Sequence, residues 1–309
     1  MLVKETDHMP ADTVASRKEV LDFLGVKSCK LVFRRWYPKK QFDSDYFKGV
    51  REATSRLCFV DFSVPNPRVT ETGAVRPFSP AFHPDGTRIV FSVSFAASDM
   101  YIQPLAPDAP AVKIGTGAYP TFWIDPGSGD TWVVYRTICE ASKTDHPGET
   151  MKMKVDPRTN EPIGEPELVY PKGFTGGLSP DGRWLATAIH WLTIADLSTG
   201  TEYHPIDNNQ ACNITHSPGS GGHVLHLCAD HRFFGSIRFD KTDKIVYEAP
   251  AGIQEFQTPK WSNHPDFAAI VGANDSWKYD VYIVRLSDQS YIKAVSGDSY
   301  VHANLWCEL

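Results

Sequence analysis

The sequence lacks the long apolar run that a membrane-spanning helix needs. Of its 309 residues 41% are hydrophobic, yet none of them form a stretch of about 18 or more apolar residues, the minimum for such a span. Residues Met1–Pro10 are polar and contain no apolar signal-peptide core. We therefore expect no membrane span. The expected compartment is periplasmic or extracellular if a leader was removed, and cytoplasmic otherwise.

The sequence also has no excess of positive charge. Its 31 Lys and Arg residues stand against 37 Asp and Glu residues, which gives a formal net charge of −6. A surface that binds nucleic acid needs a basic excess, because the phosphates dominate the affinity. We therefore expect no nucleic-acid partner. The charge balance is ordinary for a globular protein that stays dissolved, and we expect a monomer.

Cysteine is sparse and is not arranged for metal binding. The six cysteines stand at positions 29, 58, 139, 212, 228 and 307, and no Cys-x-x-Cys pair occurs. A zinc ribbon is therefore excluded. Most of these residues are expected to be buried free thiols, because Cys packs in strands as a small hydrophobic residue. We expect neither a metal nor another cofactor.

What the sequence does contain is a pattern that occurs five times. An apolar residue leads into a turn built on Pro with Asp or Gly, and a β-rich run follows. The copies are Ser79–Gly86, Tyr119–Pro126, Gly177–Gly182, Asn213–Gly219 and Pro259–Asp266. Their spacing of about 40 to 55 residues is the period of propeller blades. Since one blade cannot bury both faces of its sheet, the pattern predicts an all-β propeller of stacked blades.

The two ends of the chain indicate how the propeller closes. The first repeat, in residues 29–72, has a second and a third strand but no first strand before them. Tyr300–Trp306 looks like a first strand with no second strand after it. We therefore expect Val301–Trp306 to pair with Lys30–Trp36. This Velcro-type closure of the first blade by the C-terminal strand removes two exposed sheet edges and gives a six-bladed β-propeller over residues 28–309.

Residues 1–27 differ from the rest and are predicted to form an N-terminal arm with a short helix. Ser16–Leu24 places its apolar residues on one side of a helix. Ser16 is a candidate N-cap, and Glu19 completes a capping box with it. Gly25 is a candidate helix stop. The arm is expected to pack on the outside of the main body.

The predicted pairing of the chain ends would bring Cys29 and Cys307 together. A disulfide between them would close a loop of nearly the whole chain, which is worth on the order of 4 to 5 kcal/mol in the chain-entropy model. A reducing cytoplasm would leave it open. The alternative is that both cysteines are buried free thiols.

The repeats resemble those of TolB-like, WD40-like β-propellers. Phe82–Gly86 and Leu178–Gly182 match the turn of that group, and Asp99–Ile102 and Asp280–Ile283 match its third strand. The fourth copy lacks the Asp of the turn, and the fifth has the turn residues in another order. The resemblance covers nearly the whole chain after residue 28 and implies the propeller fold. It implies no single function, because such repeats serve accessory proteins, peptidases, lyases and sugar-binding domains.

The candidate site lies on the loops that rim the central channel, where propellers usually bind ligands. The candidate ligand-binding residues end second strands or start inner strands of different blades, and they are Arg35, Trp36, Arg136, His190, Trp191, His231, Arg232, Asn274, Asp275, Trp277 and His302; inner-strand starts also add Asn213 and Lys260. Trp beside Arg, Asp and Asn is typical of a carbohydrate site, because aromatic faces stack on sugars while polar groups orient hydroxyls. The alternative is that the Trp residues pack between blades and the charges are solvated.

The histidines give a weaker indication of chemistry. His223 and His226 are three apart in a strand, so they face opposite sides and cannot bind one ion. Only His302 with His231 or His190 stays open as a metal-binding pair. The Gly-x-Ser-x-Gly nucleophile elbow of a propeller peptidase is absent.

These observations predict a binding domain that recognises a saccharide or a protein partner at the channel face. Converging Arg35, Arg136 and Arg232 would favour an acidic ligand, because guanidinium binds carboxylate or sulfate through two hydrogen bonds. One alternative is a polysaccharide lyase or glycosidase that uses His231, Arg232 or His302, with Asp230 and Asp275 as candidate carboxylates. Another is an assembly platform that binds proteins through its outer surface. The sequence identifies no catalytic residue.

Overall fold

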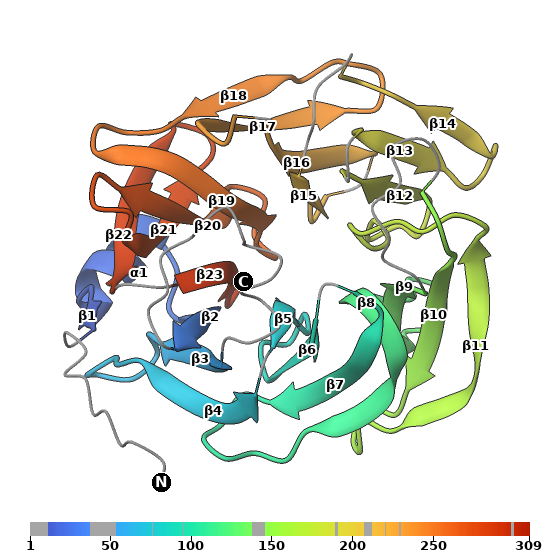
Figure 1. Ribbon diagram of the computed structural model, residues 1–309, viewed down its shortest axis with the longest axis horizontal. Helices are drawn as coiled ribbons and strands as arrows, with labels where there is room; N and C mark the ends of the chain where they lie inside the picture. Colours follow the sequence, from blue (N-terminus) through green and yellow to red (C-terminus); the bar gives the residue numbers. More distant parts are fainter. Residues whose placement is uncertain are drawn as a thin grey trace, which may run out of the picture.

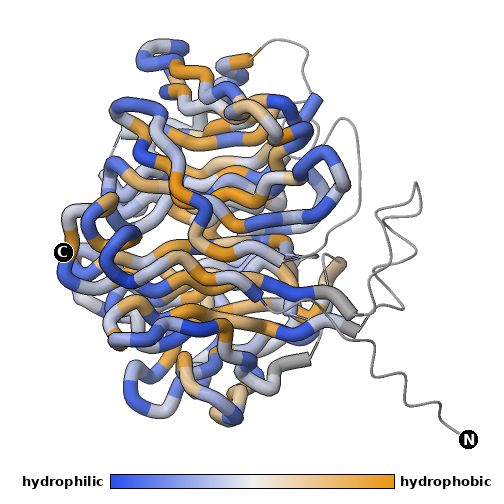
Figure 2. The backbone as a smooth tube through the Cα atoms, turned by 90° about the vertical axis from the view of Figure 1, so that its left-hand side faces the viewer, coloured by the Kyte–Doolittle hydropathy of each residue, from blue (hydrophilic) through white to orange (hydrophobic). Residues whose placement is uncertain are grey.

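The computed structural model describes residues 12–37, 54–75, 77–94, 96–137, 146–188, 191–206, 212–219, 221–228, 230–297 and 300–309. Within these residues the chain forms one short helix and 23 strands, so it is all-β as the repeats predict. The sheets stand around a common centre (Figure 1). Figure 2 shows hydrophobic segments along the strands and hydrophilic segments in the turns that join them.

Strands β2 to β11, together with β23 from the C-terminal end, form one four-stranded sheet and one seven-stranded sheet. The four-stranded sheet has the order β23 (Tyr300–Cys307), β2 (Cys29–Tyr37), β3 (Thr54–Asp61) and β4 (Thr70–Val75). The seven-stranded sheet contains β5 (Phe78–Phe82), β6 (Arg88–Ser92), β7 (Ser98–Pro104), β8 (Val112–Ile124), β9 (Thr131–Arg136), β10 (Thr150–Val155) and β11 (Pro162–Tyr170). Its long strand β8 pairs with β7 in its first half and with β9 in its second half.

The remaining strands, β12 to β22 and β1, form three further sheets. The three-stranded sheet consists of β12 (Trp184–Thr187), β13 (Thr193–Asp196) and β14 (Thr201–Tyr203). The next sheet has the order β15 (Cys212–His216), β16 (His223–Leu227), β17 (Phe233–Arg238) and β18 (Ile245–Glu248). The last contains β19 (Ile253–Trp261), β20 (Phe267–Asn274), β21 (Tyr279–Arg285), β22 (Ser290–Ser296) and β1 (Thr13–Val14).

The chain ends pair as the sequence predicts. Strand β23 is antiparallel to β2, with Trp306 opposite Lys30 and Tyr300 opposite Arg35. Cys29 lies directly opposite Cys307, and both are buried free thiols in this structure. The predicted disulfide is therefore not formed, although the pairing on which it depended is present.

The N-terminal helix α1 (Arg17–Leu24) is also present. The Ser16 hydroxyl accepts a hydrogen bond from the Glu19 amide, and the Glu19 carboxylate accepts one from the Ser16 amide, so the predicted capping box is confirmed. Gly25 ends the helix with a φ of 67°, which favours glycine. The apolar side of α1 packs against the cluster that β2, β20, β21 and β23 build, and β1 pairs with β22.

Two of the predicted turns hold a tryptophan from the preceding sheet. The Trp306 indole lies against Gly86 and donates to the Pro84 carbonyl at 2.7 Å. The Trp123 indole lies against Gly182 in the same way and donates to the Ser179 carbonyl at 3.1 Å. Both glycines have positive φ, and a Cβ on either would overlap the indole. The Asp-Gly turns of the sequence therefore fix neighbouring sheets to each other.

Candidate functional site

A cavity of about 210 Å³ lies where the inner strands meet. Its walls come from β5, β8, residues 175–180, β15, β19 and β23, so segments from both halves of the chain contribute to them. Strand β23 contacts both β19 and β5, and β15 contacts both β12 and β19. Figure 1 shows β5, β15, β19 and β23 around the middle of the molecule.

Five inner strands enter the cavity through a β-bulge. One residue in each has positive φ although it is not glycine: Ser79 (48°), Tyr119 (53°), Asn213 (47°), Thr258 (50°) and His302 (56°). The strand register shifts at or beside each of these positions. A bulge inserts one unpaired residue and re-aims the side chains that follow it. The same local distortion is thus repeated around the centre.

The residue two positions after each bulge lines the cavity. These residues are Ala81, Thr121, Thr215, Lys260 and Asn304, and we call them the cavity ring. Two of them bind the backbone of the next inner strand: Thr215 Oγ1 accepts from the Trp261 amide at 2.9 Å, and Asn304 Oδ1 accepts from the Phe82 amide at 2.9 Å. The ring side chains therefore replace backbone hydrogen bonds that the innermost strands cannot make among themselves.

Lys260 is the charged member of the cavity ring. Its side chain runs from β19 to β5, where Nζ donates to Ser79 Oγ at 3.1 Å and to the Pro80 carbonyl at 2.9 Å. The residue is only 9% exposed, and burial lowers the pKa of its amine to about 7. Among the described residues that line the cavity there is no Asp or Glu. An ammonium group here has hydrogen bonds but no carboxylate in the cavity wall.

Two further polar atoms of the wall have no hydrogen-bond partner within the described residues. One is Thr121 Oγ1 and the other is His216 Nδ1. His216 Nε2 lies 3.1 Å from the Gly177 carbonyl, which can only accept, so Nε2 carries the hydrogen. Burial lowers the pKa of His216 to about 4, and the ring is therefore neutral near pH 7. His216 Nδ1 is then an acceptor that is buried within the wall.

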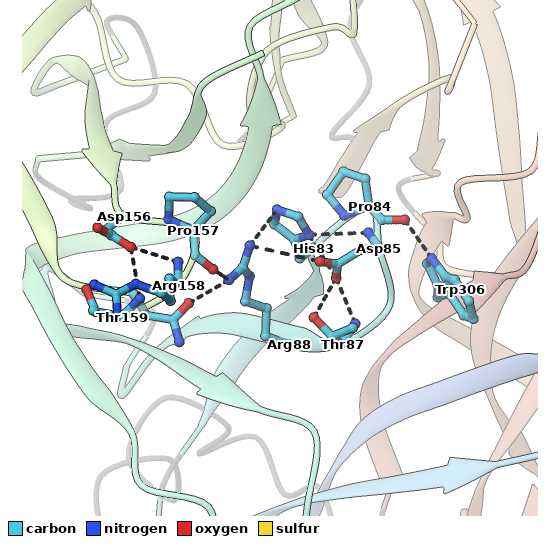
Figure 3. A network of polar contacts seen from close by, with 11 residues as sticks. His83, Pro84, Asp85, Thr87, Arg88, Asp156, Pro157, Arg158, Thr159 and Trp306 are labelled. Atoms are coloured by element: carbon cyan, nitrogen blue, oxygen red, sulfur yellow. Dashed lines mark hydrogen bonds and ion pairs between the residues drawn. The ribbon is translucent and has the colours of Figure 1, made fainter.

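His83 forms part of the wall beside the Pro84 turn (Figure 3). Its Nδ1 lies 2.9 Å from Asp85 Oδ1, and its Nε2 lies 3.1 Å from the Arg88 guanidinium. Arg88 is fixed in turn by Asn160 Oδ1 at 3.1 Å, in the turn between β10 and β11. Burial, and after it the charge of Arg88, lowers the pKa of His83. With both ring nitrogens engaged, His83 is a rigid wall residue and not a free base.

His302 lies at the bulge of β23, beside the cavity ring. It is 2% exposed, its ring centre is 4.5 Å from that of Phe78, and neither ring nitrogen has a partner among the described residues. Its pKa is well below the usual value, first because of burial and then because of the positive charges of Arg34 and Lys260. The charges of Arg34 and Lys260 therefore both disfavour a protonated His302.

The two buried arginines of the predicted site are bound to the protein itself. Arg35 forms an ion pair with Asp12 of the N-terminal arm and donates to the Tyr300 hydroxyl at 3.0 Å. Arg136 is completely buried and donates to the Pro147 carbonyl at 2.9 Å. Neither side chain lines the cavity.

The other predicted residues lie in turns. The His231 ring contacts Gln257 Nε2 at 3.1 Å, and Asn274 Oδ1 accepts backbone hydrogen bonds within its own turn. Arg232 and Asp275 are exposed, and so are Trp191 (38%) and Trp277 (49%). The Trp36 side chain and His190 lie outside the described residues.

The cavity wall shares no described residue with the predicted ligand-binding set, although it includes the inner-strand residues Asn213 and Lys260. Sequence reasoning placed the candidate site on the loops and, of the cavity ring, named only Lys260. A signal was present: Pro80, Pro120 and Pro259 directly follow three of the bulge residues. Proline cannot donate to a sheet ladder, so within a strand pattern it marks an edge or a bulge.

The described residues show neither a metal site nor a membrane helix. No group of three or more His, Cys, Asp and Glu side chains in the described ranges is arranged to hold a metal ion. The single described helix has eight residues, and no helix in this part of the chain is long and apolar enough to cross a membrane.

The architecture is that of a β-propeller, and comparison with known proteins specifies which kind. No protein-family model matches the chain, and the comparison with curated proteins finds no match. TolB from Acinetobacter baumannii is similar in structure, with a TM-score of 0.61, 12% identity, and 93% of this chain and 69% of that one covered. A putative TolB from Agrobacterium tumefaciens gives a TM-score of 0.53 and 14% identity over 92% of this chain and 99% of that one.

A structure of a nidogen/laminin complex is also similar, with a TM-score of 0.57 and 7% identity over 90% of this chain and 98% of that one. Identities this low show the fold alone. The chain has a TolB-like β-propeller fold, as the resemblance of its repeats implies.

Proposed function

We propose that residues 28–309 form a six-bladed propeller that the C-terminal strand closes, with residues 1–27 as a separate arm. Support comes from the pairing of β23 with β2 and from the two-sided pairing of β8, which divides the seven-stranded sheet into two blade-sized units. The three-stranded sheet then gains residues 175–180 as its inner segment through the bridge between Leu178 and Leu185. A closed ring leaves no unpaired edge between the first and last blades.

We propose further that this propeller is a binding protein whose partner is another protein, a segment of which enters the central cavity. The observation that carries the proposal is the cavity lined by all inner segments. Its volume of about 210 Å³ is below the roughly 300–1,000 Å³ of drug-sized ligand sites. One or two side chains fit such a space, whereas a chain of sugar rings does not. One of the similar structures is itself a complex between nidogen and laminin.

The predicted loop residues enter this proposal in two roles. Exposed Trp191, Arg232, Asp275 and Trp277 are proposed as contacts with the partner outside the cavity, because their side chains reach solvent. Arg35 and Arg136 are proposed to position loops, since their guanidinium groups bind the protein itself. Exposed Trp191 and Trp277 also support a second candidate, an acidic saccharide that stacks on these indoles.

A phage-displayed library of random 12-residue peptides tests the proposal. Peptides enriched on the wild-type protein are measured again with Ala81→Trp, which fills the cavity, and with Leu168→Ala, which removes an exposed apolar side chain of β11 outside the proposed site. We expect Ala81→Trp to weaken binding at least tenfold and Leu168→Ala to change it little. Ala81→Leu, a milder filling, replaces Ala81→Trp if the latter fails to fold.

The alternatives give different results. If enriched peptides bind the cavity-filled variants as tightly as the wild type, the partner uses the outer surface and the assembly platform is favoured. If no peptide is enriched and a glycan array gives binding that Trp191→Ala or Trp277→Ala abolishes, the saccharide is favoured. Turnover of a polysaccharide would favour the lyase or glycosidase. Any of these results contradicts the proposal.

A further inference from the structure

The central cavity combines a buried cation with a wall that has no acidic side chain among its described residues. We propose that it is a binding site for one carboxylate group, with Lys260 as the counter-charge. This inference rests on the proposed function and specifies the chemistry that the cavity recognises: an Asp or Glu side chain, or a terminal carboxylate, of the entering segment.

The geometry of Lys260 favours an incoming acceptor. The bulge at Thr258 directs the Lys260 side chain into the cavity wall. There Ser79 Oγ and the Pro80 carbonyl accept two of the three hydrogens of the Lys260 ammonium group. One hydrogen is left for a ligand. Because β5 already fixes the amine, a carboxylate would meet a pre-positioned donor and not a flexible side chain.

The charges around Lys260 also favour an anion. Arg34 on β2 is a positive neighbour of His302, which lies on β23 and is held neutral. On β15, His216 is neutral, and at the end of β5 the charge of Asp85 is engaged with His83, Thr87 and Arg88. A buried ammonium without a nearby counter-charge is disfavoured, and an opposite charge at hydrogen-bond distance relieves this penalty.

The size of the charge selects between anions. One lysine balances the single negative charge of a carboxylate, whereas a phosphate group near pH 7 would bring up to two negative charges into a wall that also contains Phe82, Phe122 and Trp261. A carboxylate attached to a peptide is such a singly charged anion.

Lysine titration by NMR tests this inference on the full-length protein. The protein is labelled with ¹³C at lysine Cε and titrated alone, with sodium acetate, and with sodium phosphate. We expect one resonance with a midpoint near pH 7, absent from Lys260→Met and present in the control Lys152→Met, whose lysine pairs with Glu167. Acetate should raise this midpoint by one unit or more, and phosphate should raise it less. If Lys260→Met does not fold, Lys260→Gln takes its place.

Peptide binding distinguishes this inference from the proposed function. Enriched peptides are compared with versions whose carboxylates are converted to amides, on the wild type, Lys260→Met and Ala81→Trp. We expect the amide versions and Lys260→Met each to lose at least tenfold in affinity, and binding of the acidic peptides to weaken as pH rises above about 7.

Binding that Ala81→Trp abolishes but Lys260→Met leaves intact would overturn the carboxylate site and uphold the binding function. Acetate binding at Lys260 with no peptide binding would uphold the site and overturn the protein partner. A Lys260 midpoint near 10 that does not respond to acetate would overturn the inference.

Discussion

Lys260 combines a cost in folding stability with the binding role proposed for it. Its amine is buried, and that burial lowers its pKa to about 7, while the unfolded chain restores a value of about 10.4. Between these two values the unfolded state binds more protons than the folded state does. Folding stability contributed by Lys260 therefore rises with pH across this window and is lowest below pH 7.

The first prediction concerns this pH dependence. Relative to Lys260→Met, the free energy of unfolding of the wild type should increase between pH 7 and pH 10 by up to about 1.4 kcal/mol per pH unit. Urea unfolding of both proteins across this range measures the difference. Burial raises the pKa of the Cys58, Cys228 and Cys307 thiols to about 12, which opposes the trend, but this effect is common to both proteins and cancels. A difference that does not vary with pH would contradict the assignment.

The second prediction concerns the glycine under Trp306. Gly86→Ala should destabilise the protein by about 2–4 kcal/mol, because positive φ costs a residue with a Cβ roughly 1–2 kcal/mol and overlap with the indole adds a packing cost. Gly129→Ala is the matched control: it has a φ of +74° and nothing within 4 Å of the added Cβ. Chemical unfolding should give a smaller loss for Gly129→Ala, and equal losses would show that the Trp306 contact is unimportant.

At this scale the sequence predicted some site residues and missed others. Lys260 and His302 were placed at starts of inner strands, and both lie at the centre. The other four residues of the cavity ring were not predicted, because the ring side chains are re-aimed by bulges at Ser, Tyr, Asn, Thr and His. Since none of these residues is glycine, the sequence gives no sign that φ is positive at these positions. Arg35 and Arg136 were predicted to converge on a ligand at the channel mouth, whereas both are buried and bind Asp12, Tyr300 and the Pro147 carbonyl of the protein itself.

At the scale of elements, the sequence predicted those features that depend on residues close together in the chain. The capping box of α1 depends on four consecutive residues and is present. The division into strands was less predictable: the repeat copy Tyr119–Pro126 marks the start of a new blade in the sequence, yet its strand residues belong to the single strand β8, which begins at Val112. Residues 175–180 form only one bridge and no full strand, because Gly176 and Gly177 interrupt the segment.

The third prediction belongs to strand β23. Deleting residues 300–309 removes the partner of β2 and the Asn304 and Trp306 contacts with β5 and its turn. We expect the truncated chain to unfold or to associate, because an unpaired hydrophobic edge is exposed. Size-exclusion chromatography with circular dichroism measures both outcomes. A truncated monomer with the stability of the full chain would contradict the closing role of β23.

At the scale of the whole molecule, the repeat period was sufficient for the fold and insufficient for the function. Stacking of blades requires only that a turn, an inner strand and an apolar run recur, and those features survive at 7–14% identity to the similar structures. The proposed binding chemistry depends on which side chains follow the bulges. That arrangement is set by contacts between strands from opposite ends of the chain, such as Lys260 with Ser79.

The most direct test of the central claim is a crystal structure of the protein with an enriched acidic peptide. The account predicts a peptide carboxylate about 2.7–2.9 Å from Lys260 Nζ inside the cavity. A peptide bound only to the outer loops around Trp191 and Trp277, with the cavity unchanged, would contradict it.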